Sequence, residues 1–165
     1  MYDSPDTLAK MIDGINEKVI YAVSSKILTL LEERINIDVY GFPNAYAAKR
    51  NAVYYKGSGI ATGEFLEAFH WDKIDIKVRD ITRELFYDTS RMNYDPDTFL
   101  HGSRKYGDLR EELSSLLNVE GIDEKNNFGG NIRHPYWDNF LKELFDDKKI
   151  DQMFDEEFLK FGITR

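Results

Sequence analysis

The segment 57–63 is the part of the chain whose residue types and spacing most resemble a cofactor-binding loop. It carries three glycines in the pattern G-x-G-x-x-x-G, after a short apolar run and before a stretch with helical character. Asp80 follows at roughly the distance, about 20 residues, at which dinucleotide folds place the acid that binds ribose. Such folds need further βα units behind the loop, whereas two adjacent strands are predicted here. We therefore predict a turn in which Thr62 caps a short helix over 63–71, with no bound cofactor.

No other combination of residues predicts catalysis or a metal site. The three histidines are scattered and share no helical spacing with one another, at His70, His101 and His134. The chain has no cysteine, which excludes a thiolate metal site, a disulfide and a cysteine nucleophile. No serine lies in a Gly-x-Ser-x-Gly turn, and no Gly-Lys-Ser/Thr phosphate loop occurs. The sequence predicts a protein that is not an enzyme and holds no metal or cofactor.

Length and charge indicate a single soluble domain over residues 1–165. Hydrophobic residues make up 42% of the chain and charged residues 32%. The net charge of −8 argues against general nucleic-acid binding, because neutralising phosphates requires clustered Lys and Arg. No apolar run approaches the roughly 20 residues of a membrane span, and the first residues lack the pattern of a signal peptide.

A long amphipathic helix is predicted from Pro5 to about Arg34. Ser4 precedes a proline suited to the first helical position, and apolar residues then recur at steps of three and four. At 1.5 Å per residue the helix would measure ~45 Å, which is long for so small a domain. Gly14 costs it about 1 kcal/mol without breaking it. Two interpretations remain open: the helix packs on its own sheet, or it reaches a neighbouring subunit.

Strands are predicted in the middle of the chain. Their positions are near Ile35–Tyr40, near Ala52–Lys56, over 73–79, where apolar and charged residues alternate strictly, and over 81–88 as the partner of 73–79. Because Asp80 is a thin turn signal, the last two could instead form one long bent strand.

Helices are predicted to return after the strands. One begins at Asp108 with a capping-box-like Glu111, one begins at Pro135, and the last is closed by Gly162. The loops 89–107 and 118–134 separate these elements from the strands and from one another. The order predicts an α+β fold, with a long N-terminal helix packed on a small, mostly antiparallel sheet and with C-terminal helices.

Several of these segments, taken in order, resemble one known family. They are the long first helix, "TGEFLEAF", the strand pair "KIDIKVRDITRELFYD", a loop with "HGS", and "RHPYWDNFLKELFDDKKI". The chain resembles the tail-completion, or head–tail joining, proteins of tailed bacteriophages. Thr62-Gly63 with Phe65 and Leu66 match the family's entry into the sheet, and 133–137 matches the Arg-Pro-Phe-like start of its C-terminal helix.

The resemblance implies a structural protein of the virion neck that lacks catalysis. It implies a ring, commonly of six copies, between portal-side proteins and the tail tube, with DNA passing through the lumen and no sequence-specific nucleic-acid binding. The protein would then be found in the virion neck or tail, and in the host cytoplasm during assembly.

The high aromatic content adds a prediction about the contacts of such a ring. The chain has 10 Tyr, 11 Phe and 2 Trp, and such residues are enriched at protein–protein interfaces. We predict subunit or partner contacts at Trp71, Arg133, Tyr136 and Trp137. The alternatives are a small acidic regulator or inhibitor that binds another protein, another minor capsid or tail component, and an enzyme that uses the glycine loop.

Overall fold

The computed structural model is α+β, with a long N-terminal helix, short antiparallel strand pairs and C-terminal helices, as the sequence predicts. It describes residues 5–40, 64–77, 80–91, 100–101, 104–105, 114, 118, 133 and 135–164. The elements are α1 (Pro5–Ile35), η1 (Asn36–Tyr40), α3 (Glu64–Glu67), β1 (Phe69–Trp71), β2 (Asp75–Lys77), β3 (Asp80–Thr82), β4 (Leu85–Tyr87), η2 (Thr89–Arg91), β5 (Leu100–His101), β6 (Arg104–Lys105), α5 (Tyr136–Leu141), η5 (Lys142–Asp146) and α6 (Lys149–Leu159).

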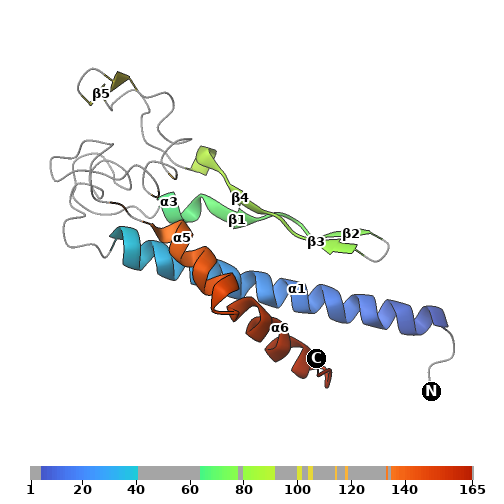
Figure 1. Ribbon diagram of the computed structural model, residues 1–165. Coiled ribbons are helices and arrows are strands. Elements are labelled where there is room, and N and C mark those ends of the chain that lie inside the picture. The colour runs from blue at the N-terminus through green and yellow to red at the C-terminus, as the bar shows by residue number, and fades with distance from the viewer. Residues whose placement is uncertain are drawn as a thin grey trace.

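The helix α1 is the axis on which the other elements are arranged (Figure 1). The C-terminal helices α5 and α6 both pack against it, and the strand ribbon contacts it through β1 and β3. Its buried residues recur every four positions at Val19, Val23, Ile27, Leu31 and Ile35. Four residues advance an α-helix by more than one turn, so the buried face winds around α1 and meets partners on different sides.

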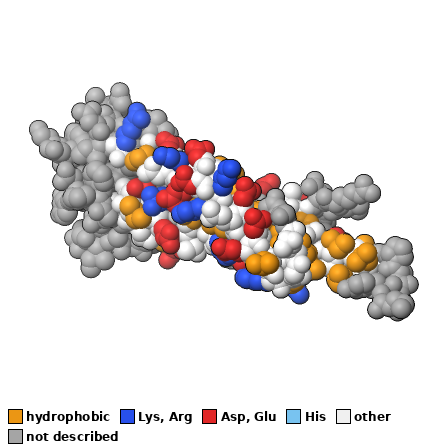
Figure 2. Space-filling model, turned by 60° about the horizontal axis from the view of Figure 1, so that its bottom comes forward, with side chains coloured by type: hydrophobic (Ala, Val, Ile, Leu, Met, Phe, Trp, Pro, Cys, Tyr) orange, Lys and Arg blue, Asp and Glu red, His pale blue; other side chains and the backbone are white. Residues whose placement is uncertain are grey.

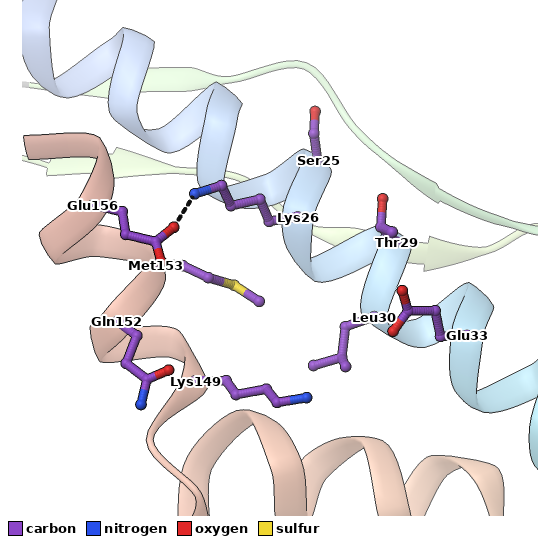
Figure 3. Close-up of a pocket in the computed structure, with 9 residues that line it drawn as sticks. All are labelled: Ser25, Lys26, Thr29, Leu30, Glu33, Lys149, Gln152, Met153 and Glu156. Atoms are coloured by element: carbon purple, nitrogen blue, oxygen red, sulfur yellow. Dashed lines mark hydrogen bonds and ion pairs between the residues drawn. The ribbon is translucent and has the colours of Figure 1, made fainter. Parts of the chain in front are cut away.

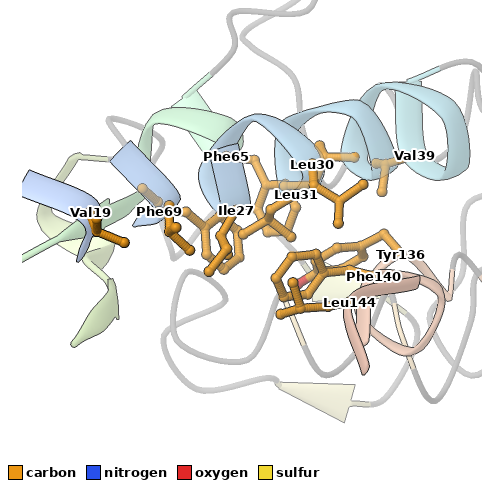
Figure 4. Packing of buried hydrophobic residues seen from close by; sticks show 13 residues of the cluster. Val19, Ile27, Leu30, Leu31, Val39, Phe65, Phe69, Tyr136, Phe140 and Leu144 are labelled. Carbon is orange, nitrogen blue, oxygen red and sulfur yellow. The ribbon is translucent and has the colours of Figure 1, made fainter. Parts of the chain in front are cut away.

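The core lies around the second half of α1, where all layers meet (Figure 4). Phe65 of α3 makes edge-to-face contacts with Phe69 and with Tyr136, both at 5.5 Å between ring centroids. Phe69 also lies 4.9 Å from the ring of Tyr87. Such pairs add to the free energy gained from burying their area, so this aromatic cluster joins α3, the ribbon and α5.

The predicted strand near Ile35–Tyr40 is wrong, because the chain continues from α1 into the π-helical turn η1. The β-branched and aromatic residues of this segment, followed by turn residues, suggested a strand. Ile35 and Val39 are fully buried, whereas Ile37 is 53% exposed. Burial therefore follows the four-residue spacing of a helix and not the two-residue spacing of a strand.

The predicted helix over 63–71 is too long. The helix α3 ends at Glu67, and Phe69–Trp71 form strand β1, which pairs antiparallel with β4 in the register Phe69↔Tyr87. Phe65, Ala68 and Phe69 are all buried across the junction of the two elements, as one helical face would be. The predicted cap Thr62 lies outside the described residues.

The strand pair predicted over 73–79 and 81–88 forms in part, because the strands are shorter and Asp80, predicted as the turn, belongs to β3. Strand β2 pairs with β3 through Ile76↔Ile81, which confirms an antiparallel pair and not one bent strand. Strand β4 pairs instead with β1, so the two ladders follow each other along one ribbon (Figure 1). The predicted strand near Ala52–Lys56, the glycine segment 57–63, and most of 89–107, of the helix from Asp108 and of 118–134 lie outside the described residues.

Both helix ends predicted for the C-terminal region are confirmed. Pro135 precedes α5, and Gly162 follows α6 with a φ of 73°. The Gly162 amide donates to the Leu159 carbonyl at 2.9 Å, and the Ile163 amide donates to the Phe158 carbonyl at 3.1 Å. These two bonds form a Schellman motif, which uses a left-handed glycine to satisfy the last carbonyls of a helix.

Ion pairs hold α6 against α1. Glu157 is 4% exposed, and its carboxylate lies 2.7 Å from Lys26 Nζ of α1 and 2.6 Å from Lys160 Nζ. Lys26 also donates to Glu156 at 2.6 Å. The hydrogen bonds from Lys160 and then Lys26 lower the pKa of Glu157. The bonds to Glu156 and Glu157 raise the pKa of Lys26 in return.

Replacing Glu157 with Gln should lower the free energy of unfolding at pH 7 by about 1–2 kcal/mol, because hydrogen bonds to a charged group are lost. A lowered carboxyl pKa stabilises the fold above the unfolded pKa, near 4.5, and this stabilisation is lost as pH falls through the folded value. The variant should therefore show a flatter acid limb in urea melts between pH 3 and 6. Glu156→Gln, at a carboxylate that is 65% exposed, is the matched control and should change little. Equal effects of the two variants would contradict the assignment.

The two described glycines give opposite predictions for alanine. A Cβ at Gly14 would meet nothing within 4 Å, so Gly14→Ala should raise the free energy of unfolding by about 0.5–1 kcal/mol. Gly162 needs its positive φ, so Gly162→Ala should destabilise by about 1 kcal/mol or more. Urea titration of both variants at low protein concentration measures the two changes. A Gly14→Ala monomer that is less stable than the wild type would contradict the finding that a Cβ at this position has open space around it.

Candidate functional site

Two of the four residues predicted at subunit contacts belong to the aromatic cluster inside the protomer. Tyr136 is fully buried, and its hydroxyl shares a hydrogen bond with the Ser114 hydroxyl. Burial raises the pKa of Tyr136 far above its ordinary value, while the bond to Ser114 lowers it slightly. Trp137 is half-buried and stacks on Phe69 at 6.3 Å between ring centroids. The Tyr136 side chain is therefore part of the core of the protomer, and a neighbouring subunit cannot reach it.

Trp71 lies on β1 and ties the ribbon to α1. Its indole Nε1 donates to the Ser24 carbonyl at 2.7 Å, and its ring is half-buried against the core. Arg133 is exposed and lies three residues before Tyr136, ahead of α5. The structure thus brings Tyr136 and Trp137 to Phe69 and places Trp71 two residues further along β1. A subunit contact by Trp71, Arg133 or Trp137 stays a prediction.

The start of α5 is capped by a residue that sequence reasoning missed. Asn118 is 9% exposed, and its Oδ1 accepts from the amides of Trp137 and Asp138 at 3.1 and 3.3 Å. Its Nδ2 donates to Asp138 Oδ1 at 3.0 Å. Pro135 precedes the helix and has no side-chain acceptor, so Asn118, which is distant in sequence, accepts hydrogen bonds from the first amides of α5. No sequence signal pointed to it, because caps are predicted from adjacent residues.

Arg34 connects the end of α1 to η5. Its Nη2 lies 3.2 Å from Glu143, which also pairs with Lys149 Nζ at 2.7 Å. The bond from Lys149, followed by the charge of Arg34, lowers the pKa of Glu143. Asn139 of α5 donates to Asp38 Oδ2 at 3.0 Å. These polar contacts hold α5 and η5 against α1, as the ion pairs of Glu157 hold α6 against it.

A groove of about 410 Å³ separates α1 from α6 (Figure 3). Leu30 and Met153 point into it, and Lys26, Lys149 and Glu156 lie at its sides (Figure 3). Both lysines already have carboxylate partners, Lys26 in Glu156 and Lys149 in Glu143. The two lysines at its sides are therefore paired within the protomer, and its described lining does not bring together residues of a catalytic arrangement.

Two exposed apolar surfaces lie near the two ends of the chain. The N-terminal apolar surface comprises Leu8, Met11 and Ile12 of α1, which are 40%, 37% and 46% exposed. The C-terminal apolar surface comprises Leu159, Phe161 and Ile163, at and beyond the end of α6, which are 62%, 40% and 40% exposed. Figure 2 shows hydrophobic side chains gathered toward the end of the molecule where α1 begins. Large exposed apolar groups clustered in this way mark interaction surfaces.

Two further observations concern the described residues alone. In this part of the chain, no three His, Asp or Glu side chains gather closely enough to hold a metal ion. None of the helices described here is both long and apolar enough to cross a bilayer.

Comparisons of the whole chain with family models, curated proteins and solved structures find no match.

Removing the cap of α5 tests the role assigned to Asn118. Asn118→Ala should lower the free energy of unfolding by about 1–2 kcal/mol, because two amides at the start of α5 lose their acceptor. Asp138→Asn keeps an acceptor oxygen for the Asn118 amide and should change stability by less than about 0.5 kcal/mol. Chemical denaturation followed by tryptophan fluorescence measures both. An unaffected Asn118→Ala would show that water replaces the cap.

Proposed function

We propose that this chain is a bacteriophage virion structural protein of the neck, of the tail-completion or head–tail joining kind. It would assemble into a ring of copies, commonly six, between portal-side proteins and the tail tube, and it would act by docking and not by catalysis. The order of elements that carries the family resemblance supports this proposal. The single structural observation that favours it is the pair of exposed apolar surfaces at the start of α1 and the end of α6.

Two different surfaces on one protomer suit the interface that a ring requires. A ring forms by heterologous contacts, in which one patch of a copy meets a different patch of the next, and the rotation closes. The N-terminal and C-terminal apolar surfaces come from different elements, so they can serve as the two patches. An isologous dimer would need only one self-complementary patch.

Helical geometry places the neighbouring charged residues away from the N-terminal apolar surface. At 100° per residue, Leu8, Met11 and Ile12 point to one side of α1. The charged residues nearest to these three in the sequence lie on the opposite side by this spacing: Asp6, Lys10 and Asp13. A neighbouring copy can therefore approach the apolar side without desolvating these charges, which favours association through it.

The acidic composition suits a ring around DNA. With a net charge of −8 per copy, a ring would present negative potential to the phosphates that pass through its lumen. Repulsion of the phosphates would keep the DNA from adhering to the wall. The adjacent partners in this proposal are the neck or portal-side proteins and the tail-tube protein.

A charge placed on the N-terminal apolar surface should prevent assembly. Native mass spectrometry of the wild type, alone and with its tail-tube neighbour, should show rings, whereas Ile12→Asp should give monomers. Ile12 is 46% exposed, so the variant should keep the wild-type melting temperature within a few degrees. The neighbouring Asp13→Ala, on the charged side of α1, is the control and should still assemble.

A wild type that stays monomeric with and without the neighbour would overturn the proposed function. If Ile12→Asp forms rings at wild-type yield, the N-terminal apolar surface is not one of the contacts between copies.

A further inference from the structure

Arg83 is held in a fixed orientation at the surface of the ribbon. Its guanidinium carbon lies 4.8 Å from the ring centroid of Tyr21 and 5.6 Å from that of Trp71. Its Nε donates to the Asp72 carbonyl at 2.9 Å. Two aromatic contacts and one hydrogen bond restrict the plane of the guanidinium, so little side-chain entropy remains to be lost when an anion binds.

The support of Arg83 is itself anchored to α1. The Trp71 indole is fixed by its bond to the Ser24 carbonyl, and Ser24 is buried in α1. Tyr21 comes from the preceding turn of the same helix and is 44% exposed. The three residues Tyr21, Trp71 and Arg83, here called the arginine platform, therefore form a rigid unit that a partner can reach. Tyr, Trp and Arg are also the residues most enriched in the energetic centres of protein interfaces.

Arg83 differs from Arg34 and Arg91, two arginines whose ion pairs are described. Arg34 pairs with Glu143 at 3.2 Å, and Arg91 pairs with Asp88 at 3.4 Å. Among the described residues, no carboxylate lies within ion-pair distance of Arg83, although the chain carries 30 acidic residues against 22 basic ones. Its Nε is used within the protomer, so the two terminal nitrogens remain to donate in a paired, bidentate way.

We propose that the arginine platform binds a carboxylate of a neighbouring copy of this chain. This inference rests on the proposed self-assembly and names one of its polar contacts. Copies of charge −8 repel each other, so a contact between them needs local cations opposite local carboxylates. Arg83 supplies such a cation in an orientation that is already fixed, and its planar guanidinium matches the geometry of a carboxylate. Every neighbouring copy offers a surplus of acidic side chains.

Loss of the guanidinium should weaken assembly without unfolding the protomer. Arg83→Gln should shift the protein concentration at which rings form by about tenfold or more in native mass spectrometry. Arg91→Gln is the matched control, because Arg91 lies on the same segment and already has a carboxylate partner, and it should assemble like the wild type. Melting temperatures of both variants establish that the protomers are folded.

The two hypotheses fail in different ways. A wild type that never assembles overturns the proposed function and this inference together. Rings of Arg83→Gln that form at the wild-type concentration overturn this inference alone.

A cross-linking experiment can identify the carboxylate. Arg83→Lys keeps the positive charge and introduces an amine. A carbodiimide activates a carboxylate, and a lysine amine in contact with that carboxylate then forms an amide while the carbodiimide leaves as a urea that carries the carboxylate oxygen. With a mixture of isotopically light and heavy copies, the expected product is a mixed peptide pair that links Lys at position 83 to an Asp or Glu of another copy. Links from this position only to acids of its own copy would contradict the proposal.

Discussion

The length of α1 relative to the core is the constraint on which the rest of the structure depends. The buried positions of α1 begin at Val19, and those of its continuation end at Val39. The C-terminal helices and the ribbon all pack against α1. A fold of this size cannot cover a 31-residue helix over its whole length, because the remaining elements are short. The first turns of α1 are therefore helical and amphipathic but not buried, and their apolar side is the surface that self-association would cover.

Polar contacts then determine how the short elements sit on α1. Burial of apolar area holds them there but is not directional, so it leaves the angle of each helix open. Glu157 between Lys26 and Lys160 fixes α6, Glu143 near Arg34 fixes η5, and Asn118 fixes the start of α5. The Glu157 and Glu143 carboxylates and the Asn118 amide each have partners within the protomer, so their burial costs little. The buried Nε of Arg34 is the exception in this set, because it has no hydrogen-bond partner among the described residues.

Sequence reasoning succeeded where one period was sustained. The apolar stripe of α1, the alternation over 73–79 and the glycine at the end of α6 gave the correct element types. It failed over 35–40 and 69–71, where three or four apolar residues fit both a helix and a strand, and long-range packing decided between them. The contacts of Asn118 and Arg83 join residues far apart in the chain, so no local pattern could have predicted them.

Net charge alone does not decide whether such acidic copies associate. At physiological ionic strength the Debye length is about 8 Å, so only charges near the contact contribute strongly. Helical spacing places the charges of the first turns of α1 away from Leu8 and Ile12, and the arginine platform places a cation where the ribbon meets solvent. In the proposed ring, repulsion of DNA by an acidic wall and attraction between copies can therefore coexist, because charges farther apart than the Debye length act nearly independently.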